Sequence, residues 1–359
     1  MTFKKILIIS LFLISLPVGA KESTNRLDYM NMDWWKNYND EVLINHFQTL
    51  YENNHDLRIA ALKTKQAEEN IRLAGANQLP QLGFDGSVSR VFRGPRTQFG
   101  SVVIPKYIQN EIFLPLNASY EIDIWGQNYL NRKSAKKQAE IAKQQERAAY
   151  IYITSSFAAD YYNLIKMDEL ERNLLKIIDL QKNIVSMTEK KYNSGLASIN
   201  EVLDEKQILV NFEKDLNKLK ENKKILNDEA LVLLGLNTDK AIELSDYQSI
   251  SSPQTPETLS TTIIQFRPDL ISSEDYVKKS GIDVRVARRD FLPKFILYGN
   301  LGFNAYKWNR MFAGETFLAN AGIAPRWDIF TGGIKMARYR INKYEYKKAV
   351  ESYEKTVLT

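Results

Sequence analysis

The string DLRIAALKTKQAEENIRLAGANQLPQLGFDG (Asp56–Gly86) decides the fold, because its pattern returns 213 positions later as DLISSEDYVKKSGIDVRVARRDFLPKFILYG (Asp269–Gly299). The two strings align without a gap. Each opens on Asp-Leu, passes through a Leu-Pro step and closes on glycine. Further on, Asp123-Ile124-Trp125 is echoed by Asp328-Ile329-Phe330. A duplicated segment indicates one structural unit used twice.

The first part of each copy has helical periodicity. The positions expected on one seam are spaced alternately three and four residues apart, and most carry small side chains. They are Leu57, Ala60, Thr64, Ala67, Ile71 and Ala74 in the first copy, and Leu270, Ser273, Val277, Ser280, Val284 and Ala287 in the second. The sequence therefore predicts a helix over 40–78 and a second one before Pro293. Small seam residues indicate that these helices pack closely against their neighbours.

Alternating sequences follow each Leu-Pro step, where proline ends the helix. Apolar and small polar residues exchange places over 82–92 and 111–124, with an irregular loop rich in Gly, Pro and Arg between them, and again over 294–304 and 316–327. An apolar face opposite a small polar face, in strands of about ten residues, is typical of a membrane barrel with an aqueous lumen. A soluble β-sandwich is the alternative from the pattern alone. The barrel would place Asp85, Ser87, Glu121 and Asp123 on the lumen face.

Residues 127–236 are rich in helix-forming residues, with a single interruption near Gly195. A ten-position seam runs from Val202 to Leu233, and eight of those ten residues are apolar. This is a strong heptad signal. We expect a very long antiparallel helical hairpin that turns at 193–198, since Gly195 tolerates positive φ.

The ends of the chain and its composition restrict the possible classes of protein. Residues 1–20 read as a secretory signal peptide: Lys4 and Lys5 precede an apolar core, and Val18-Gly19-Ala20 forms a cleavage site. The chain has no cysteine, so it has no disulfide and no N-terminal lipidated cysteine. Removing Lys4 and Lys5 leaves 47 basic and 43 acidic residues. This mild, dispersed charge argues against nucleic acid as a partner.

The order of these elements resembles the plan of the TolC-like outer membrane efflux proteins, in the branch that serves resistance-nodulation-division multidrug pumps. The resemblance covers the chain after the signal peptide. Its supporting strings are Trp34-Trp35 with Asp40 and Leu43, Ser119–Gly126 (SYEIDIWG), Lys191–Ser198 (KYNSGLAS) and Arg267-Pro268-Asp269-Leu270.

The resemblance implies an α+β membrane protein of two repeats, each a helix, two strands and a long helical hairpin. The domains are then a first repeat over 21–236, an equatorial connector over 237–262 and a second repeat over 263–359. Three protomers would form a homotrimer with a 12-stranded β-barrel in outer-membrane lipid and a periplasmic coiled-coil barrel of helices. The localisation implied is the cell outer membrane of a Gram-negative bacterium.

The resemblance also implies a function and its partners. The chain would be the passive exit duct of a tripartite efflux system, for drugs and other small molecules, without a cofactor. Its partners would be a periplasmic adaptor (membrane fusion protein) and an inner-membrane transporter. The hairpin tip would dock the adaptor through Gly195, Leu196, Ala197, Ser198, Asn200 and Val202. A role of Gly195 in the turn alone is the alternative.

The second repeat is expected to be incomplete. Gly195 follows Asp123 by 72 positions, so the second tip is expected near position 400, beyond Thr359. The sequence then contains only the start of the last long helix. This predicts either a piece of a longer protein or a truncated product with impaired function.

Other functions are less compatible with the residues. An enzyme would need a site, yet His46 and His55 are the only histidines, and no metal-ligand cluster, phosphate loop or nucleophile motif occurs. Channels for type I protein secretion share the architecture, so the sequence does not separate that role from drug efflux. A truncated non-functional remnant, or a periplasmic coiled-coil protein without a pore, is a further alternative. The four amphipathic strands argue against a coiled-coil protein without a pore. Substrate range, the particular pump and the gating residues are not encoded in any pattern of this sequence.

Overall fold

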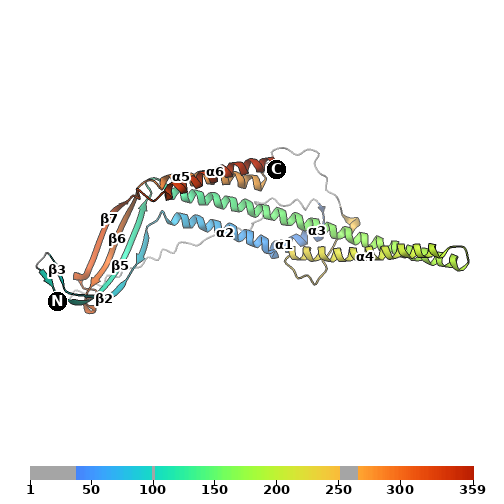
Figure 1. The fold of residues 1–359 in the computed structure, drawn as a ribbon, viewed down its shortest axis with the longest axis horizontal. Coiled ribbons are helices and arrows are strands. Elements are labelled where there is room, and N and C mark those ends of the chain that lie inside the picture. Colours follow the sequence, from blue (N-terminus) through green and yellow to red (C-terminus); the bar gives the residue numbers. More distant parts are fainter. Residues whose placement is uncertain (1–37, 99–101, 251–265) are drawn as a thin grey trace.

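The computed structural model describes residues 38–98, 102–250 and 266–359. The predicted signal peptide and part of the predicted connector lie outside these residues. The described chain is elongated, with a β-sheet at one end and the tip of a helical hairpin at the other (Figure 1). None of its helices is both long enough and apolar enough to cross a membrane.

The helices are α1 (Glu41–Asn53), α2 (His55–Ala76), α3 (Gln127–Asn193), α4 (Ile199–Leu233), α5 (Pro268–Arg289) and α6 (Ile334–Leu358). The strands are β1 (Gln81–Phe84), β2 (Ser87–Arg93), β3 (Arg96–Gln98), β4 (Val102–Ile104), β5 (Tyr107–Ile122), β6 (Lys294–Ala305) and β7 (Phe317–Arg326). Helix α2 and helix α5 each have 22 residues. Their bounds differ by the same 213 positions as the repeated strings, so the duplication in sequence is a duplication in structure.

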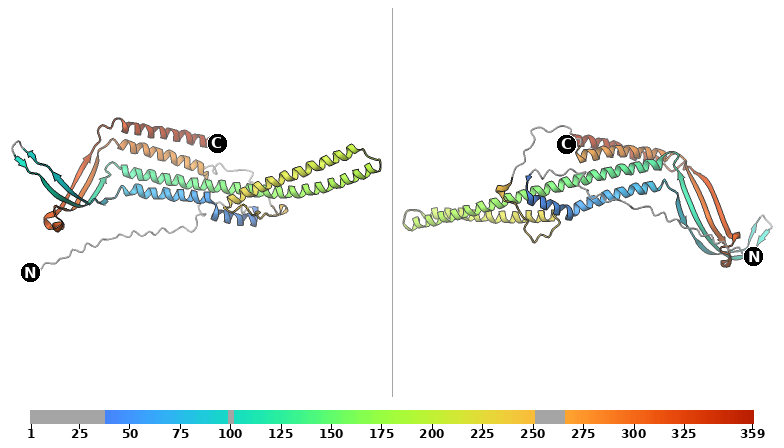
Figure 2. Two further views of the ribbon diagram at one scale, coloured as in Figure 1. Left: turned by 60° about the horizontal axis from the view of Figure 1, so that its bottom comes forward. Right: turned by 180° about the vertical axis from the view of Figure 1, so that it is seen from behind.

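Helices and strands follow the same lateral order. The main sheet is antiparallel, in the order β1–β5–β6–β7, and β2 also pairs with β5. Helix α2 packs on α3, α3 on α5, and α5 on α6. Helix α2 leads into β1, β5 leads into α3, α5 leads into β6, and β7 leads into α6. Each pair of neighbouring strands is therefore connected to a pair of neighbouring helices. The sheet and these four helices therefore form one curved layer rather than two packed layers (Figure 2).

Two of the predicted elements are divided. The helix expected over 40–78 breaks at Asn54, whose backbone is extended (φ −62°, ψ 122°). The Asn54 side chain accepts a hydrogen bond from the Leu57 N–H at 2.9 Å, and its amide donates to the Leu233 carbonyl at 2.7 Å. Asn54 thus ends α1, caps α2 and joins both to α4, and these contacts outweigh continued helix formation.

The strand expected over 82–92 is β1 followed by β2, interrupted at Asp85-Gly86. Phe84 pairs with Leu116, and Ser87 pairs with Phe113, so the register on β5 continues unchanged across the interruption. The sheet therefore has four strand positions, as the sequence predicts. The loop expected to be irregular contains the β3–β4 hairpin and the first residues of β5, which differs from the prediction.

Close helix packing through small residues is confirmed between α2 and α3. Ala67 packs with Ala139 and Ala142, and all three side chains are buried. The Thr64 hydroxyl reaches the Ala142 carbonyl of the neighbouring helix at 3.3 Å. Larger side chains at these positions would hold the two backbones too far apart for this contact.

The main hydrophobic core lies at the middle of the molecule, where α1 and the segment after α4 pack on α3 and α4. Its buried residues include Phe47, Phe157, Tyr161 and Leu234. His46 lies against this core with its ring on Phe157 and Tyr161, and its Nε2 atom lies 2.9 Å from the Glu243 carbonyl oxygen. His55 is exposed.

Candidate functional site

The first candidate site is the tip of the hairpin, Ser194–Ser198, between α3 and α4. Gly195 has φ +75°, in the left-handed region. The Leu196 N–H donates to the Lys191 carbonyl at 2.8 Å and the Gly195 N–H to the Tyr192 carbonyl at 2.9 Å. This pair of bonds is the Schellman motif, which satisfies the last carbonyls of α3.

The return helix begins with a capping box. The Ser198 side chain accepts from the Glu201 N–H, and the Glu201 carboxylate accepts from the Ser198 N–H at 2.9 Å. These bonds lower the pKa of the Glu201 carboxyl, first through the Ser198 backbone donor and then through its hydroxyl. Local hydrogen bonds therefore set the shape of the tip on both sides of Leu196.

The tip presents an apolar side chain to solvent. The Leu196 side chain is 79% exposed, and Ile199 next to the cap is 49% exposed. Asn200 is also exposed. Val202, which the sequence placed in the docking surface, is instead buried at 4% exposure. Because its side chain is enclosed, Val202 supports the start of α4 from inside and does not form part of the tip surface.

Polar contacts hold the two hairpin helices together behind the tip. The Gln181 amide donates to the Glu205 carboxylate at 2.6 Å and to the Glu205 carbonyl at 3.1 Å. The Lys223 ammonium lies 2.6 Å from Asp168 and 2.8 Å from Glu171. The hydrogen bond from Lys223 lowers the pKa of the Asp168 carboxyl. Glu205 and Lys223 are the two charged members of the predicted α4 seam, and both have polar partners on α3.

The second candidate site is the polar face of the sheet. The register places Leu116 beside Phe84 and Leu301, and Leu297 beside Tyr120 and Ile323, so one face is apolar across the main sheet. The opposite face carries Asn117, Asn300 and Asn320 in one row across β5, β6 and β7. The predicted alternation of faces is thus present in the structure. The asparagine row was not identified from sequence, since it depends on register between strands that are far apart in the chain.

Three of the four predicted lumen residues lie on or beside this polar face. Asp85 accepts a hydrogen bond from the Asn117 amide at 2.7 Å. Ser87 pairs with Phe113 in the same alternation. Glu121 forms an ion pair with Lys294 at 3.1 Å at the helical end of the sheet.

Asp123 lies elsewhere, because β5 ends at Ile122. Its two carboxylate oxygens accept from the Asn128 N–H at 3.1 Å and the Tyr129 N–H at 2.9 Å. Asp123 therefore caps the start of α3, where free backbone N–H groups favour an anion. The predicted strand to residue 124 extended two positions too far.

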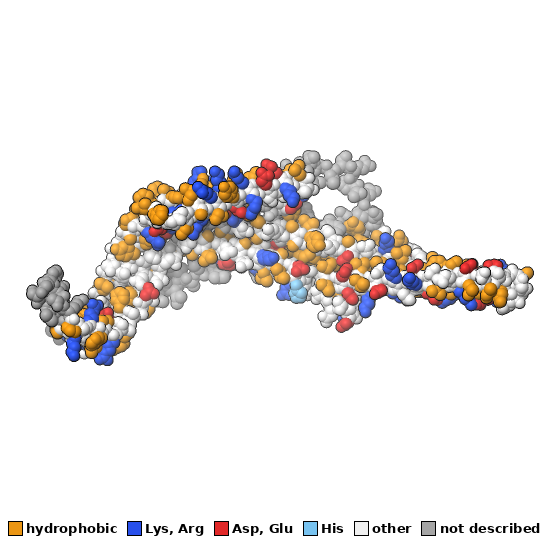
Figure 3. Space-filling view, in the orientation of Figure 1, with side chains coloured by type: hydrophobic (Ala, Val, Ile, Leu, Met, Phe, Trp, Pro, Cys, Tyr) orange, Lys and Arg blue, Asp and Glu red, His pale blue; other side chains and the backbone are white. Residues whose placement is uncertain are grey.

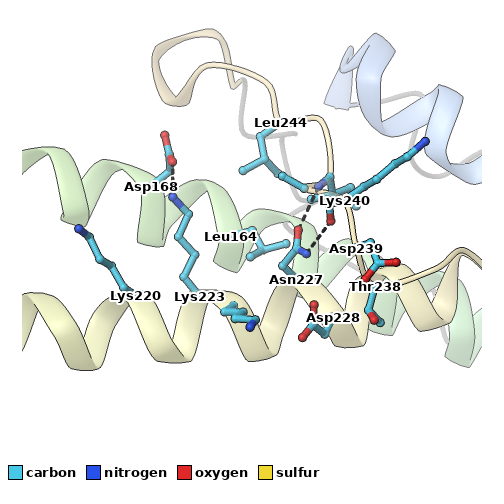
Figure 4. Close-up of a pocket in the computed structure, with 13 residues that line it drawn as sticks. Leu164, Asp168, Lys220, Lys223, Asn227, Asp228, Thr238, Asp239, Lys240 and Leu244 are labelled. Atoms are coloured by element: carbon cyan, nitrogen blue, oxygen red, sulfur yellow. Dashed lines mark hydrogen bonds and ion pairs between the residues drawn. The ribbon is translucent and has the colours of Figure 1, made fainter.

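A groove beside the core lies outside these two sites (Figure 4). It has a volume of about 490 Å³ and lies between α3, α4 and the segment 238–244. The Asn227 amide donates to the Lys240 carbonyl, and its oxygen accepts from the Ile242 N–H, both at 3.0 Å. These bonds attach the connector to α4, and the groove is the space left between the two. The described residues include no group of three His, Cys, Asp or Glu side chains placed to hold a metal ion.

Comparison with known proteins links these features to one family. The family model described as outer membrane efflux protein matches residues 47–233 and 259–359. The pyoverdine export outer membrane protein OpmQ of Pseudomonas putida is 24% identical over 329 residues, which cover 90% of this chain and 69% of that protein. The cation efflux system protein CusC of Escherichia coli O157:H7 is 24% identical over 339 residues, covering 92% and 70%. The toluene efflux pump outer membrane protein TtgC of Pseudomonas putida is 27% identical over 337 residues, covering 91% and 67%.

Solved structures share the fold. The outer membrane protein VceC of Vibrio cholerae superposes with a TM-score of 0.80 at 23% identity, covering 91% of this chain and 78% of that one. The CmeC outer membrane channel of Campylobacter jejuni gives a TM-score of 0.82 at 24% identity, covering 91% and 70%.

Proposed function

Because this chain belongs to the outer membrane efflux protein family, we propose that it is the outer membrane channel of an efflux system. It provides a passive exit duct through the outer membrane of a Gram-negative bacterium. Its role is transport rather than catalysis. The energy for export comes from an inner-membrane transporter, so the duct needs no cofactor of its own.

The observation that carries this proposal is the single curved layer formed by the sheet and by α2, α3, α5 and α6. An ordinary domain buries the apolar side of a sheet against a second layer. Here the apolar face includes Leu82, Phe84, Leu301 and Ile323, all of which are at least 49% exposed. A layer with one apolar and one polar face suits a segment of a barrel, with lipid outside and water inside.

Closure of the barrel requires further copies of the chain. We propose a homotrimer in which each protomer contributes four strand positions, β1 with β2, β5, β6 and β7. The β1 and β7 edges of the described sheet would pair with neighbouring protomers, because barrels have no free edges. The asparagine row would then face the lumen, running obliquely because the strands of a barrel are tilted.

The hairpin supports a connection to the inner membrane. Helix α3 has 67 residues, which corresponds to a length of about 100 Å. It extends from the sheet to the tip, at opposite ends of the molecule (Figure 2). We propose that the tip, through Leu196, Ala197, Ser198 and Asn200, docks a periplasmic adaptor that connects the duct to the transporter.

The relatives differ in the cargo that their names give. Three of them are named for pyoverdine export, cation efflux and toluene efflux. These are chemically unrelated substrates for ducts of one architecture. We infer that the adaptor and transporter select the cargo, and that this chain provides a general polar passage for it.

A deletion and complementation experiment tests the proposal. The gene is deleted in its native host and restored as wild type, as Leu196→Glu or as Gln207→Glu. The last variant adds the same charge at an exposed α4 position away from the tip. Susceptibility to a panel of toxic compounds, adaptor cross-linking and outer-membrane content are measured.

The expected result is that deletion raises susceptibility and that Gln207→Glu restores export. Leu196→Glu should reach the outer membrane yet lose both cross-linking and export. Unchanged susceptibility in the deletion strain across the panel would contradict the efflux role. Normal export by Leu196→Glu would contradict only the assignment of the tip.

A further inference from the structure

The apolar face of the sheet ends in a charged row at the end far from the helices. Arg90 lies on this face, between Val88 and Phe92 in the alternation of β2, and pairs with Asn110 of β5. Within β1, β2, β5, β6 and β7, Arg90 is the one charged residue whose register places it on the apolar face.

Lys307 lies at the same end of the sheet, two residues beyond the end of β6. The pairing of β5 with β6 ends at Ile112 and Ala305, and Lys307 lies in the bend that follows. Its backbone is extended (φ −133°, ψ 137°) directly before the short 3-10 helix Trp308–Arg310. Arg90 and Lys307 therefore both lie beyond the level of Ile112 on β5.

The level of this row matches a membrane boundary. The apolar face runs without a charge from Ile122 to Ile112 on β5, ten residues that span about 33 Å along the strand. At a strand tilt of about 40° this corresponds to a height of about 25 Å, the thickness of the apolar band of outer-membrane barrels. Arg90, Asn110 and Lys307 follow directly beyond that band, where lipid headgroups begin.

Exposed aromatic side chains occur at the same end of the sheet. Phe312 and Phe317 both pack on Phe303, with ring centroids 5.3 and 5.9 Å apart, and both are more than half exposed. Phe92 and Trp308 are also exposed at this end of the sheet. Exposed aromatic rings of this kind are typical of the interface between hydrocarbon and headgroups.

The cations in the row are not neutralised by the described part of the chain. Arg90 and Lys307 are exposed, and neither is among the residues that form ion pairs there, whereas the nearby Arg310 is paired with Glu315. Lys106, exposed just before β5, adds a further positive charge. Figure 3 shows Lys and Arg side chains among hydrophobic ones at this end of the molecule. Two free cations at one end of the sheet, one of them paired with an asparagine, supply the charge and hydrogen-bond donors that phosphate needs.

We propose that Arg90, Asn110 and Lys307, hereafter the distal row, bind the phosphate groups of anionic lipid headgroups in the membrane leaflet at this end of the barrel. This inference rests on the proposed function, since it requires the sheet to lie in a bilayer. A phosphorylated lipid satisfies both features at once, because its acyl chains cover the apolar face while its phosphates meet the cations. Free phosphate would use only the cations.

The test uses the whole protein, purified in detergent and reconstituted into phosphatidylcholine vesicles with or without lipid A. Vesicles of phosphatidylcholine alone, supplied with inorganic phosphate, form a third arm. The variants are Arg90→Gln/Lys307→Gln and a control, Lys63→Gln/Lys136→Gln, which removes two exposed charges on helices α2 and α3, away from the row. Flotation reports insertion, and lipid A retained by the repurified protein reports binding.

Wild type and control should retain lipid A selectively. The double variant should bind lipid A about thirty-fold more weakly, because each lost cation lowers the affinity about fivefold. Equal retention by the double variant, or no preference of wild type for lipid A, would overturn the distal row as a lipid site. If inorganic phosphate at equal concentration displaced lipid A, the ligand of the distal row would be phosphate and not a lipid. Failure of wild type to float with vesicles would instead overturn the proposed function itself.

Discussion

The Tyr161 hydroxyl of α3 donates a hydrogen bond to the Asp40 carboxylate at 3.0 Å, although the two residues are 121 positions apart. The same hydroxyl accepts from the Ser245 N–H at 3.1 Å, and the Ser245 hydroxyl donates to Asp40 at 2.8 Å. Asp40 also caps α1 through the Leu43 N–H. One tyrosine thus joins the start of α1, the middle of α3 and the connector after α4.

Tyr161→Phe should destabilise the equatorial core. The side chain is fully buried, so losing its hydroxyl leaves the Ser245 N–H and one Asp40 oxygen without that partner. We expect the free energy of unfolding to fall by about 1–3 kcal/mol. Denaturant titration followed by circular dichroism measures the loss. Tyr152→Phe, at a 73% exposed position of the same helix, is the control and should change little.

The stability of wild type should also fall in alkali. Burial, as the largest cause, raises the pKa of Tyr161 to about 12, against an ordinary value of 10.0. The unfolded chain therefore releases this proton before the folded chain does, and stability decreases as the pH rises from 10 toward 12. Burial also raises the pKa of Tyr162, so this residue contributes to the same loss of stability. Unfolding curves across this pH range should show a shallower decrease in Tyr161→Phe; identical slopes would contradict the assignment.

Ala67→Leu should disturb the close contact between α2 and α3. Ala67 is buried against Ala139 and Ala142, so added methylenes force the helices apart. Overpacking of this kind costs about 1–3 kcal/mol. Gln66→Leu introduces the same side chain at the adjacent exposed position and should leave the thermal midpoint nearly unchanged. A similar midpoint for both variants would show that the contact is not tightly packed.

Leu116→Arg and Ser119→Arg should have different effects, because they place the same charge on opposite faces of the sheet. Leu116 lies on the apolar face, and Ser119 lies on the polar face, three residues further along β5. Arginine at the middle of a lipid-facing surface costs about 2–4 kcal/mol, whereas a lumen position tolerates it. The measurement is the amount of folded protein in the outer membrane. A greater loss from Ser119→Arg would reverse the proposed orientation of the sheet.

Gly195→Val should weaken the hairpin turn through its backbone alone. No atom lies within 4 Å of the Cβ position, so space is not limiting, whereas φ +75° is unfavourable for a branched side chain. The expected cost is about 1–2 kcal/mol. Gly195→Asn should cost less, because asparagine tolerates this conformation better. Amide hydrogen exchange at 190–200 measures local opening, and equal protection in the two variants would refute the strain argument.

Elements governed by local pattern were predictable from sequence. In α4, each predicted seam position from Val202 to Leu233 is buried or partly buried, whereas most of the positions between them are exposed. A heptad pattern predicts this result directly, because a helix face is determined by spacing along one chain. The alternating faces of the strands follow from the same kind of regularity.

Features that depend on particular side-chain contacts, rather than on periodicity, were missed. The break at Asn54 is stabilised by its bond to Leu233, and helical periodicity runs through this position without interruption. Asp123 continues the strand alternation in sequence, yet the first N–H groups of α3 bind its carboxylate. The placement of Arg90 on the apolar face requires the register of β2 on β5. For Asn54 the deciding partner is 179 positions away, although the Asn-Asn-His-Asp string at 53–56 is a local cap signal. The partners of Asp123 are only five and six positions away, and the strand alternation through Asp123 concealed them.

The hydrogen bonds at the hairpin tip have a thermodynamic consequence for recognition. Gly195, Ser198 and Glu201 hold the backbone in its turn without help from any other molecule. A partner that meets the exposed Leu196 side chain therefore finds a rigid template and loses little conformational entropy in ordering it. Affinity at such a surface is governed mainly by the rate of dissociation, so exchanging one residue at the tip can change the lifetime of a complex without altering how fast it forms.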